Sequence, residues 1–228
     1  MESNTENQIL TVDNFQDLIN TIYEGEKNAI CWERKLSGDF SEIVKKVKIV
    51  DNITVIDAEY LQELELSKEG EIAREIIIND LKLLSEFGAD PVLNLIQCYE
   101  QDEENSIFPT DVYSYHVDRS PLPTDTFLCT YYGDPSEIIP NSQAVQKILI
   151  PEIREELLKQ FGGDVEDFES YLTENFFDLH YQATPEAEPL SLGLGNLWRL
   201  AIDHPELRVP PCVHRAPKEK TSRLLLIC

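Results

Sequence analysis

The spacing of the apolar residues changes near residue 90, and this change limits the folds open to the chain. Over residues 71–87 the apolar side chains recur with the helical period of 3.6, and Gly88 follows as a typical C-terminal cap. From residue 91 onward, short runs rich in β-branched and aromatic residues alternate with turns. We therefore expect an α+β protein, with a mainly helical layer over residues 1–90 packed outside a sheet-rich core over residues 91–228.

The alternating runs predict the strands of the core. They fall at residues 92–99, 110–117, 126–132, 178–182, 190–201, 207–214 and 221–227. Residues 141–177 return to the helical period, with breaks expected at Pro151 and at Gly162-Gly163. Such an insertion either covers an open face of the sheet or shapes a substrate entrance. The first 90 residues are expected to add helices at 13–25 and 40–47 and short strands at 28–32 and 53–56.

Composition narrows the classes of partner and compartment. The formal net charge of −24 would repel phosphate backbones, so nucleic acid is not an expected partner. No run approaches the roughly 20 apolar residues that a membrane span requires. The five cysteines are scattered without a Cys-x-x-Cys pair, which speaks against a zinc ribbon or a disulfide framework. With an acidic, polar N-terminus unlike a signal peptide, the chain is expected in the reducing cytoplasm.

The segment around His116 and Asp118 carries the strongest chemical signal. On a strand, residues i and i+2 point to the same face, so these two side chains could reach one metal ion together. His214 would supply a third ligand, brought in by the fold. Two imidazoles and one carboxylate on one side of Fe(II) leave positions open for substrate and oxygen, although Zn²⁺, Mn²⁺ or Ni²⁺ would suit the same donors. In isolation, a His-x-Asp pair is more often a surface pair or a hydrogen-bonded core pair.

The ordered set His116, Asp118, His214 and Arg223 resembles the pattern of the Fe(II)/2-oxoglutarate-dependent dioxygenases. In that superfamily a distal histidine is followed, about one strand later, by a basic residue that binds the co-substrate. The residues Arg215-Ala216-Pro217 are similar to the His-Arg-x-Pro ending that is common there.

The resemblance implies a fold and a set of cofactors. The fold would be a double-stranded β-helix, the jelly-roll core that cupins also have. The cofactors would be Fe(II), held by the three ligands, and 2-oxoglutarate, whose distal carboxylate would pair with Arg223. A hydroxyl of Thr130 or Tyr132, which share one strand face, would help Arg223 to hold that carboxylate, although the sequence leaves open which face points inward.

The implied reaction is hydroxylation of a small-molecule or peptide substrate. The aspartate favours hydroxylation over halogenation, because halogenases of the superfamily lack that carboxylate. The chain is more similar still to a group of small bacterial proteins without an established activity. It shares with them Trp32-Glu33-Arg34, His-x-Asp-Arg and the segment Cys129-Thr130-Tyr131.

Two other classes of function stay open. One is a cupin-like metalloprotein that uses the same pocket without 2-oxoglutarate, and the other is a non-catalytic binding module. Arg119 and Arg215 each follow a candidate ligand and would form structural ion pairs or meet an anionic substrate at the pocket mouth. His180 stands outside the pattern and is the first replacement candidate if another histidine proves wrong. The oligomeric state and the substrate are not predicted.

Overall fold

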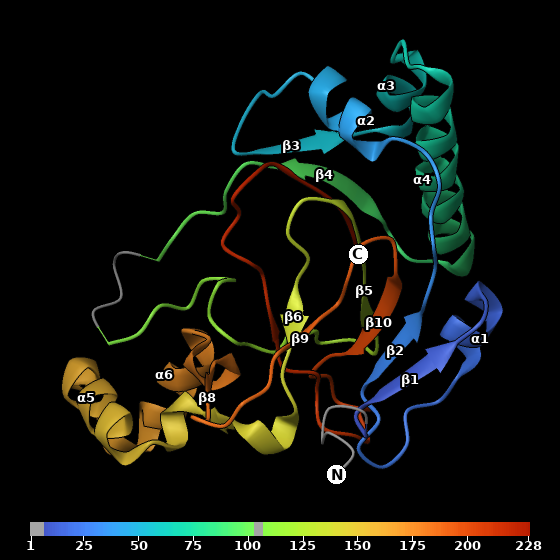
Figure 1. Ribbon diagram of the computed structural model, residues 1–228. Helices are drawn as coiled ribbons and strands as arrows, with labels where there is room; N and C mark the ends of the chain where they lie inside the picture. Colours follow the sequence, from blue (N-terminus) through green and yellow to red (C-terminus); the bar gives the residue numbers. More distant parts are fainter. Residues whose placement is uncertain (1–6, 103–106) are drawn as a thin grey trace.

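A large, mostly antiparallel sheet organises the molecule, as seen in a computed structural model that describes residues 7–102 and 107–228 (Figure 1). Within these residues the sheet has seven strands in the order β1-β2-β10-β5-β12-β4-β3. Their bounds are β1 Ile9–Val12, β2 Ala29–Trp32, β3 Ile53–Ile56, β4 Val92–Ile96, β5 Asp125–Tyr132, β10 Leu197–Ala201 and β12 Arg223–Ile227. β1 and β2 pair in parallel, and the other neighbours pair antiparallel. The expected α+β class is therefore observed.

The central strands β4, β12, β5 and β10 are buried on both faces, which explains their largely apolar sequences. On β12, Leu224 and Leu226 belong to one apolar cluster, whereas Leu225 between them belongs to another. On β5, Cys129 faces the first cluster and Leu128 the second. The alternation places one core under the N-terminal helices and the other between the large sheet and the second half of the chain.

Helices from the first half of the chain cover the outer face of the sheet (Figure 1). Their bounds are α1 Phe15–Asn20, α2 Phe40–Lys46, α3 Ala58–Glu63 and α4 Lys68–Phe87. The longest, α4, is capped by the Ser67 side chain at its start and ends at Gly88, which adopts a left-handed φ of 101°. Ala73, Ile77 and Leu84 turn its apolar stripe toward the sheet.

Residues 1–90 form more than a helical cover. The predicted short strands in this range become β2 and β3, and a further strand, β1, lies beside β2. These strands extend the large sheet at both ends. Their backbone groups are satisfied by joining strands that arise later in the chain. The first six residues of the range lie outside the described part.

Two smaller sheets lie across from the large one. The first has the order β11-β6-β9, with β6 Glu137–Ile138, β9 Leu190–Ser191 and β11 His214–Arg215. The second pairs β7 Ala144–Gln146 with β8 Tyr181–Ala183. His116 forms single bridges to His214 and to His180, so its segment continues the first small sheet beyond β11.

The helical insertion is shorter than residues 141–177 predict. It contains α5 Pro151–Phe161 and α6 Phe168–Glu174, joined by 3-10 turns η1 Asn141–Gln143, η2 Lys147–Leu149, η3 Val165–Asp167 and η4 Phe177–Leu179. Pro151 begins α5 instead of breaking a longer helix, because a first helical position needs no N–H donor. Strand β7 occupies part of the preceding segment. Figure 1 shows α5 and α6 at the far side of the molecule from α4.

Several predicted strands are replaced by turns. The segment expected as a strand at 110–117 contributes one bridge at His116, because Asp111 organises a local turn by accepting hydrogen bonds from the backbone N–H groups of Tyr113 and Ser114. In 207–214, only His214 is in a strand, since Pro210 and Pro211 cannot donate to a ladder. Residues 178–182 and 190–201 are likewise divided between turns and shorter strands.

No helix among the described residues is long and apolar enough to cross a membrane.

Candidate metal centre

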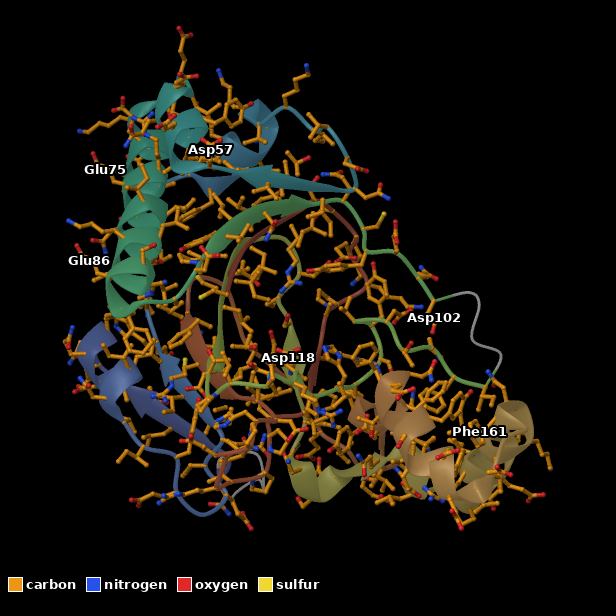
Figure 2. The ribbon with its side chains drawn as sticks, turned by 180° about the vertical axis from the view of Figure 1, so that it is seen from behind. Asp57, Glu75, Glu86, Asp102, Asp118 and Phe161 are labelled. Atoms are coloured by element: carbon orange, nitrogen blue, oxygen red, sulfur yellow. The ribbon has the colours of Figure 1, made fainter. Side chains whose placement is uncertain are left out.

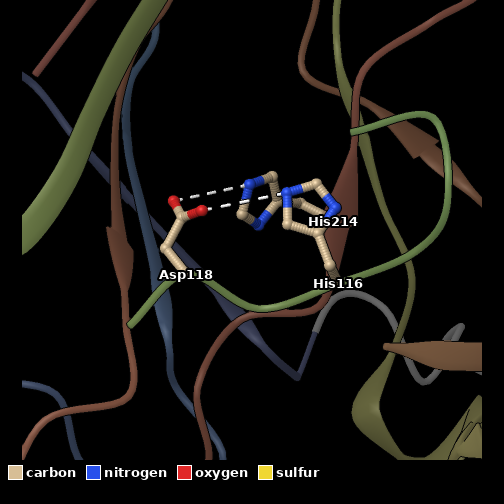
Figure 3. A group of neighbouring side chains, drawn as sticks. All are labelled: His116, Asp118 and His214. Carbon is tan, nitrogen blue, oxygen red and sulfur yellow. Dashed lines mark ion pairs between the residues drawn. The ribbon is translucent and has the colours of Figure 1, made fainter. Parts of the chain in front are cut away.

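His116, Asp118 and His214 converge at one point, where each offers a ligand atom within 4.8 Å of the other two (Figure 3). His116 Nε2 lies 3.8 Å from Asp118 Oδ1, and His214 Nε2 lies 3.6 Å from Asp118 Oδ2. Figure 3 shows the carboxylate facing both rings. Asp118 lies near the centre of the molecule, whereas Asp57, Glu75 and Glu86 lie along the outer helices (Figure 2). The three side chains can therefore hold a metal ion.

Backbone pairing brings the two histidines together from distant parts of the chain. The N–H of His116 donates to the carbonyl of His214, and the N–H of His214 donates back, each at 2.9 Å. Directly opposed residues in an antiparallel pair project to the same face, and the ring centroids lie 4.5 Å apart. Asp118 follows two residues after His116, and its carbonyl accepts from the N–H of Asp203 at 2.8 Å.

Each donor group is oriented by a second hydrogen bond. His116 Nδ1 lies 2.7 Å from the carbonyl of Ser114, and His214 Nδ1 lies 3.2 Å from the carbonyl of Cys212. A carbonyl oxygen only accepts, so both Nδ1 atoms carry a proton, and in the neutral form of each ring the Nε2 lone pair is the one available to a metal ion. Thr126 Oγ1 donates to Asp118 Oδ2 at 2.6 Å. Such supporting contacts are typical of metal ligands in proteins.

The electrostatic environment favours the protonation states that bind metals. Burial lowers the pKa of His116 to about 4, and the neighbouring His214 acts in the same direction, so the imidazole is neutral near pH 7. Burial alone would raise the pKa of Asp118, but the proximity of His214 and the hydrogen bond from Thr126 hold that pKa below its ordinary value. Neutral imidazoles and an ionised carboxylate are the forms that coordinate a cation.

A buried arginine without an acidic partner lies in the same region. Arg223 is 1% exposed, and its Nη2 donates to Thr130 Oγ1 at 3.1 Å and to Ser136 Oγ at 2.7 Å. Its Nε has no hydrogen-bond partner. Burial lowers the pKa of Arg223, and no carboxylate of the described residues forms an ion pair with it. Because a buried charge without an ion-pair partner is costly, this guanidinium is suited to an anionic ligand.

One cavity of about 260 Å³ joins the three candidate metal ligands to the arginine. Its volume lies below the range of about 300–1,000 Å³ that is usual for drug-sized ligands, so it suits a small metabolite. Asn94, Tyr99 and Ser136 supply further polar groups. The remaining wall is apolar and comes from Ile53, Ile96, Val112, Leu128, Ala216, Leu225 and Ile227.

The two hydroxyl residues predicted beside Arg223 take different positions. Thr130 contacts the guanidinium, whereas Tyr132 packs against the cluster under the N-terminal helices. The reason is a β-bulge: Leu225 pairs with Thr130 but Leu224 pairs with Tyr132, so one residue of β5 is left over. The structure therefore brings Thr130, but not Tyr132, into contact with Arg223.

The two arginines that follow the metal ligands form ion pairs. Arg119 lies 2.6 Å from a carboxylate oxygen of Asp178 and 2.6 Å from one of Asp203. Arg215 pairs with Glu137 and lies over the Tyr115 ring, 4.3 Å from its centroid. Neither lines the cavity. Both therefore act as structural ion pairs, as one of the two interpretations of the sequence held.

His180 is buried beside the centre without offering a ligand atom to it. Its ring centroid lies 5.8 Å from that of His116, and its Nδ1 has no hydrogen-bond partner. Burial lowers the pKa of His180 to about 3. It remains neutral and packs against the edge of the metal-binding group.

Four polar residues of the site were not predicted from the sequence: Asn94, Tyr99, Thr126 and Ser136. Thr126 could have been found, because it lies four residues before Thr130 on the same strand, so both side chains point to the same, inward face. Ser136 follows a turn and carries no signal in the sequence. Asn94 stands in an apolar run, where a single amide is not a specific sign of a binding site.

No protein-family model, curated protein or solved structure matches this chain. The site alone thus defines the class: a protein with a small buried cavity that joins a possible metal-binding triad to an uncompensated arginine.

Proposed function

We propose that the protein is an Fe(II)- and 2-oxoglutarate-dependent oxygenase that hydroxylates a small-molecule or peptide substrate. The observation that carries the proposal is the shared cavity, with three metal-binding side chains and a buried arginine that lacks an acidic partner. A metal site alone would fit many enzymes. The added anion site fits a co-substrate that has one carboxylate for the arginine and a second polar end for the metal.

The strand order supports a double-stranded β-helix. In the large sheet β4, β12, β5 and β10 are neighbours, and in the small sheet the His116 segment, β11, β6 and β9 follow in order. The cavity is lined by residues from both sheets. Two such sheets enclosing a small ligand are the architecture expected of a jelly-roll core.

The donor set supports iron. Two neutral imidazole nitrogens and one carboxylate suit Fe(II) when they leave other coordination positions open. Iron held there together with a 2-oxo acid would supply the oxidising chemistry. The chain's part is to hold His116, Asp118 and His214 in place, through the carbonyls of Ser114 and Cys212 and the hydroxyl of Thr126.

Arg223 would anchor the co-substrate. Its Nη2 is already fixed by hydrogen bonds to Thr130 and Ser136. Its Nε has no hydrogen-bond partner and could donate to a carboxylate of the co-substrate. The apolar side chains around it exclude water, which strengthens this interaction.

The five free cysteines suit a reducing compartment such as the cytoplasm, which we include in the proposal.

An anaerobic titration tests the proposal. Purified protein receives Fe(II) and then 2-oxoglutarate, while the visible charge-transfer band of the iron–oxo-acid chelate is followed. His116→Ala should abolish the band, because it removes a metal ligand. Arg223→Met should leave iron bound but raise the concentration of 2-oxoglutarate needed.

The outcomes separate the candidate functions. A band that depends on both residues supports the oxygenase. Iron binding without a band would refute the co-substrate and favour a cupin-like metalloprotein. A protein that binds no transition metal would instead be a binding module, and the proposed metal site would be wrong.

A further inference from the structure

Asn94 presents an unused amide to the cavity. It is 9% exposed, lies in the middle of β4 and lines the cavity together with the metal ligands and Arg223. Its backbone pairs with Val55 of β3 and Leu225 of β12. Among the hydrogen bonds between described residues, none involves the side chain of Asn94, although this amide carries two N–H donors and one acceptor.

The register of β4 and β12 places this amide next to the anion site. Arg223 pairs with Ile96, and Leu225 pairs with Asn94. Arg223 and Asn94 are thus diagonal neighbours on the cavity face of one antiparallel pair, a relation that typically separates residues by about 7–8 Å. One small ligand can therefore touch both side chains.

The unused amide has a cost in the ligand-free protein. The amide faces the cavity, where its apolar neighbours Ile53, Ile96 and Leu225 offer it no hydrogen-bond partner, so it contributes less to stability than an apolar side chain would. A leucine would fill the same position at lower cost. Its presence is explained if a ligand completes its hydrogen bonds.

We propose that Asn94 is a positioning residue for the dicarboxylic co-substrate, donating from Nδ2 to an oxygen near the end of the ligand that lies away from Arg223. This inference rests on the proposed function and deepens it. Arg223 would fix one carboxylate by charge, and the neutral amide of Asn94 would donate a hydrogen bond to the charged group at the other end. Together they set the position and direction of the ligand in the cavity.

The test uses full-length protein and 2-oxoglutarate as the probe. The anaerobic Fe(II) titration is run on wild type, Asn94→Leu and Asn94→Asp, with Asn175→Leu on the exposed end of α6 as a matched control. Thermal unfolding is recorded for each protein without and with Fe(II) and 2-oxoglutarate. These readouts separate ligand affinity, metal affinity and stability.

Asn94→Leu should weaken 2-oxoglutarate binding about tenfold to a hundredfold, as for loss of a hydrogen bond to a charged group, while iron affinity stays unchanged. Its ligand-free melting temperature should equal or exceed that of wild type, which a structural role for the amide would not allow. Asn94→Asp should bind 2-oxoglutarate more weakly still, because its carboxylate would repel the ligand and compete for Arg223.

Unchanged 2-oxoglutarate affinity in Asn94→Leu, or in Asn94→Asp if the leucine variant does not fold, would refute the role of Asn94 and leave the oxygenase proposal standing. Parallel losses of iron and 2-oxoglutarate affinity would also refute it, since they would indicate a general distortion. Absence of the band in wild type would overturn both proposals.

Discussion

Arg34 and Arg223 both lie largely inside the protein, and their substitution should change stability in opposite ways. Arg34 binds Asp80 through two hydrogen bonds, 2.7 Å from Nη1 to Oδ1 and 2.8 Å from Nη2 to Oδ2. Asp80 is 1% exposed and also accepts from Tyr131 Oη at 2.7 Å. Although burial lowers the pKa of Arg34, the contacts with Asp80 raise it above its ordinary value. Arg223 has no such partner, and burial lowers its pKa.

The contacts of each arginine determine how much its substitution should change the free energy of unfolding. Arg34→Met leaves Asp80 as a buried carboxylate without its cation, so the free energy of unfolding should fall by about 3–5 kcal/mol. Arg223→Met removes a buried charge that no ion pair compensates, although Glu219 and Asp134 act on it at longer range, and loses two hydrogen bonds to hydroxyls, each worth about 1 kcal/mol. The free energy of unfolding should therefore stay unchanged or rise by up to about 2 kcal/mol.

Urea denaturation of the metal-free proteins measures both values. Lys82→Met serves as a control, since Lys82 forms an exposed pair with Glu86 on α4 and should change stability by less than about 1 kcal/mol. If Arg223→Met destabilises the protein as much as Arg34→Met does, then Arg223 has a structural role and the proposed anion site is refuted.

Three further results are expected. Thr126→Val should weaken metal binding about tenfold, because Asp118 loses the donor that orients it, and a titration with Fe(II) would contradict this if affinity were unchanged. Burial lowers the pKa of Lys147 from 10.5 to about 8, so the unfolded chain binds more protons between these values and this group makes stability rise with pH across that range. Urea titrations at pH 7.5 and 9.5 should show a smaller rise in Lys147→Met than in wild type. Finally, iodoacetamide at pH 8 should modify the exposed Cys98 before Cys129, whose pKa burial raises to about 12, and mass spectrometry would show a reversed order if the burial were wrong.

The sequence predicted best those elements whose pattern is local. The helix expected at 71–87 is found as α4 Lys68–Phe87, and the strand expected at 126–132 is found as β5 Asp125–Tyr132. Both have long, regular apolar spacing. The strand expected at 110–117 was wrong except at His116, because the side chain and carbonyl of Asp111 form a turn that competes with pairing.

The candidate site was predictable where chemistry and order along the chain carry the signal. His116, Asp118 and His214 were expected to meet, and the structure brings them within ligand distance. The bulge that removes Tyr132 from the cavity depends on how β12 pairs with β5, and no single strand encodes that register. Asn94 could not be recognised as a site residue from the sequence, because its place beside Arg223 depends on how β4 pairs with β12.

The reciprocal hydrogen bonds between His116 and His214 also bear on how the protein is made. His214 is synthesised long after the other two ligands, and its strand must pair before the set is complete. A nascent chain that has emerged only as far as Asp118 holds one imidazole and one carboxylate, too few donors to retain a metal ion against cellular chelators. Under the proposed function, metal loading would therefore wait until the strand of His214 has been synthesised and has paired with the segment of His116.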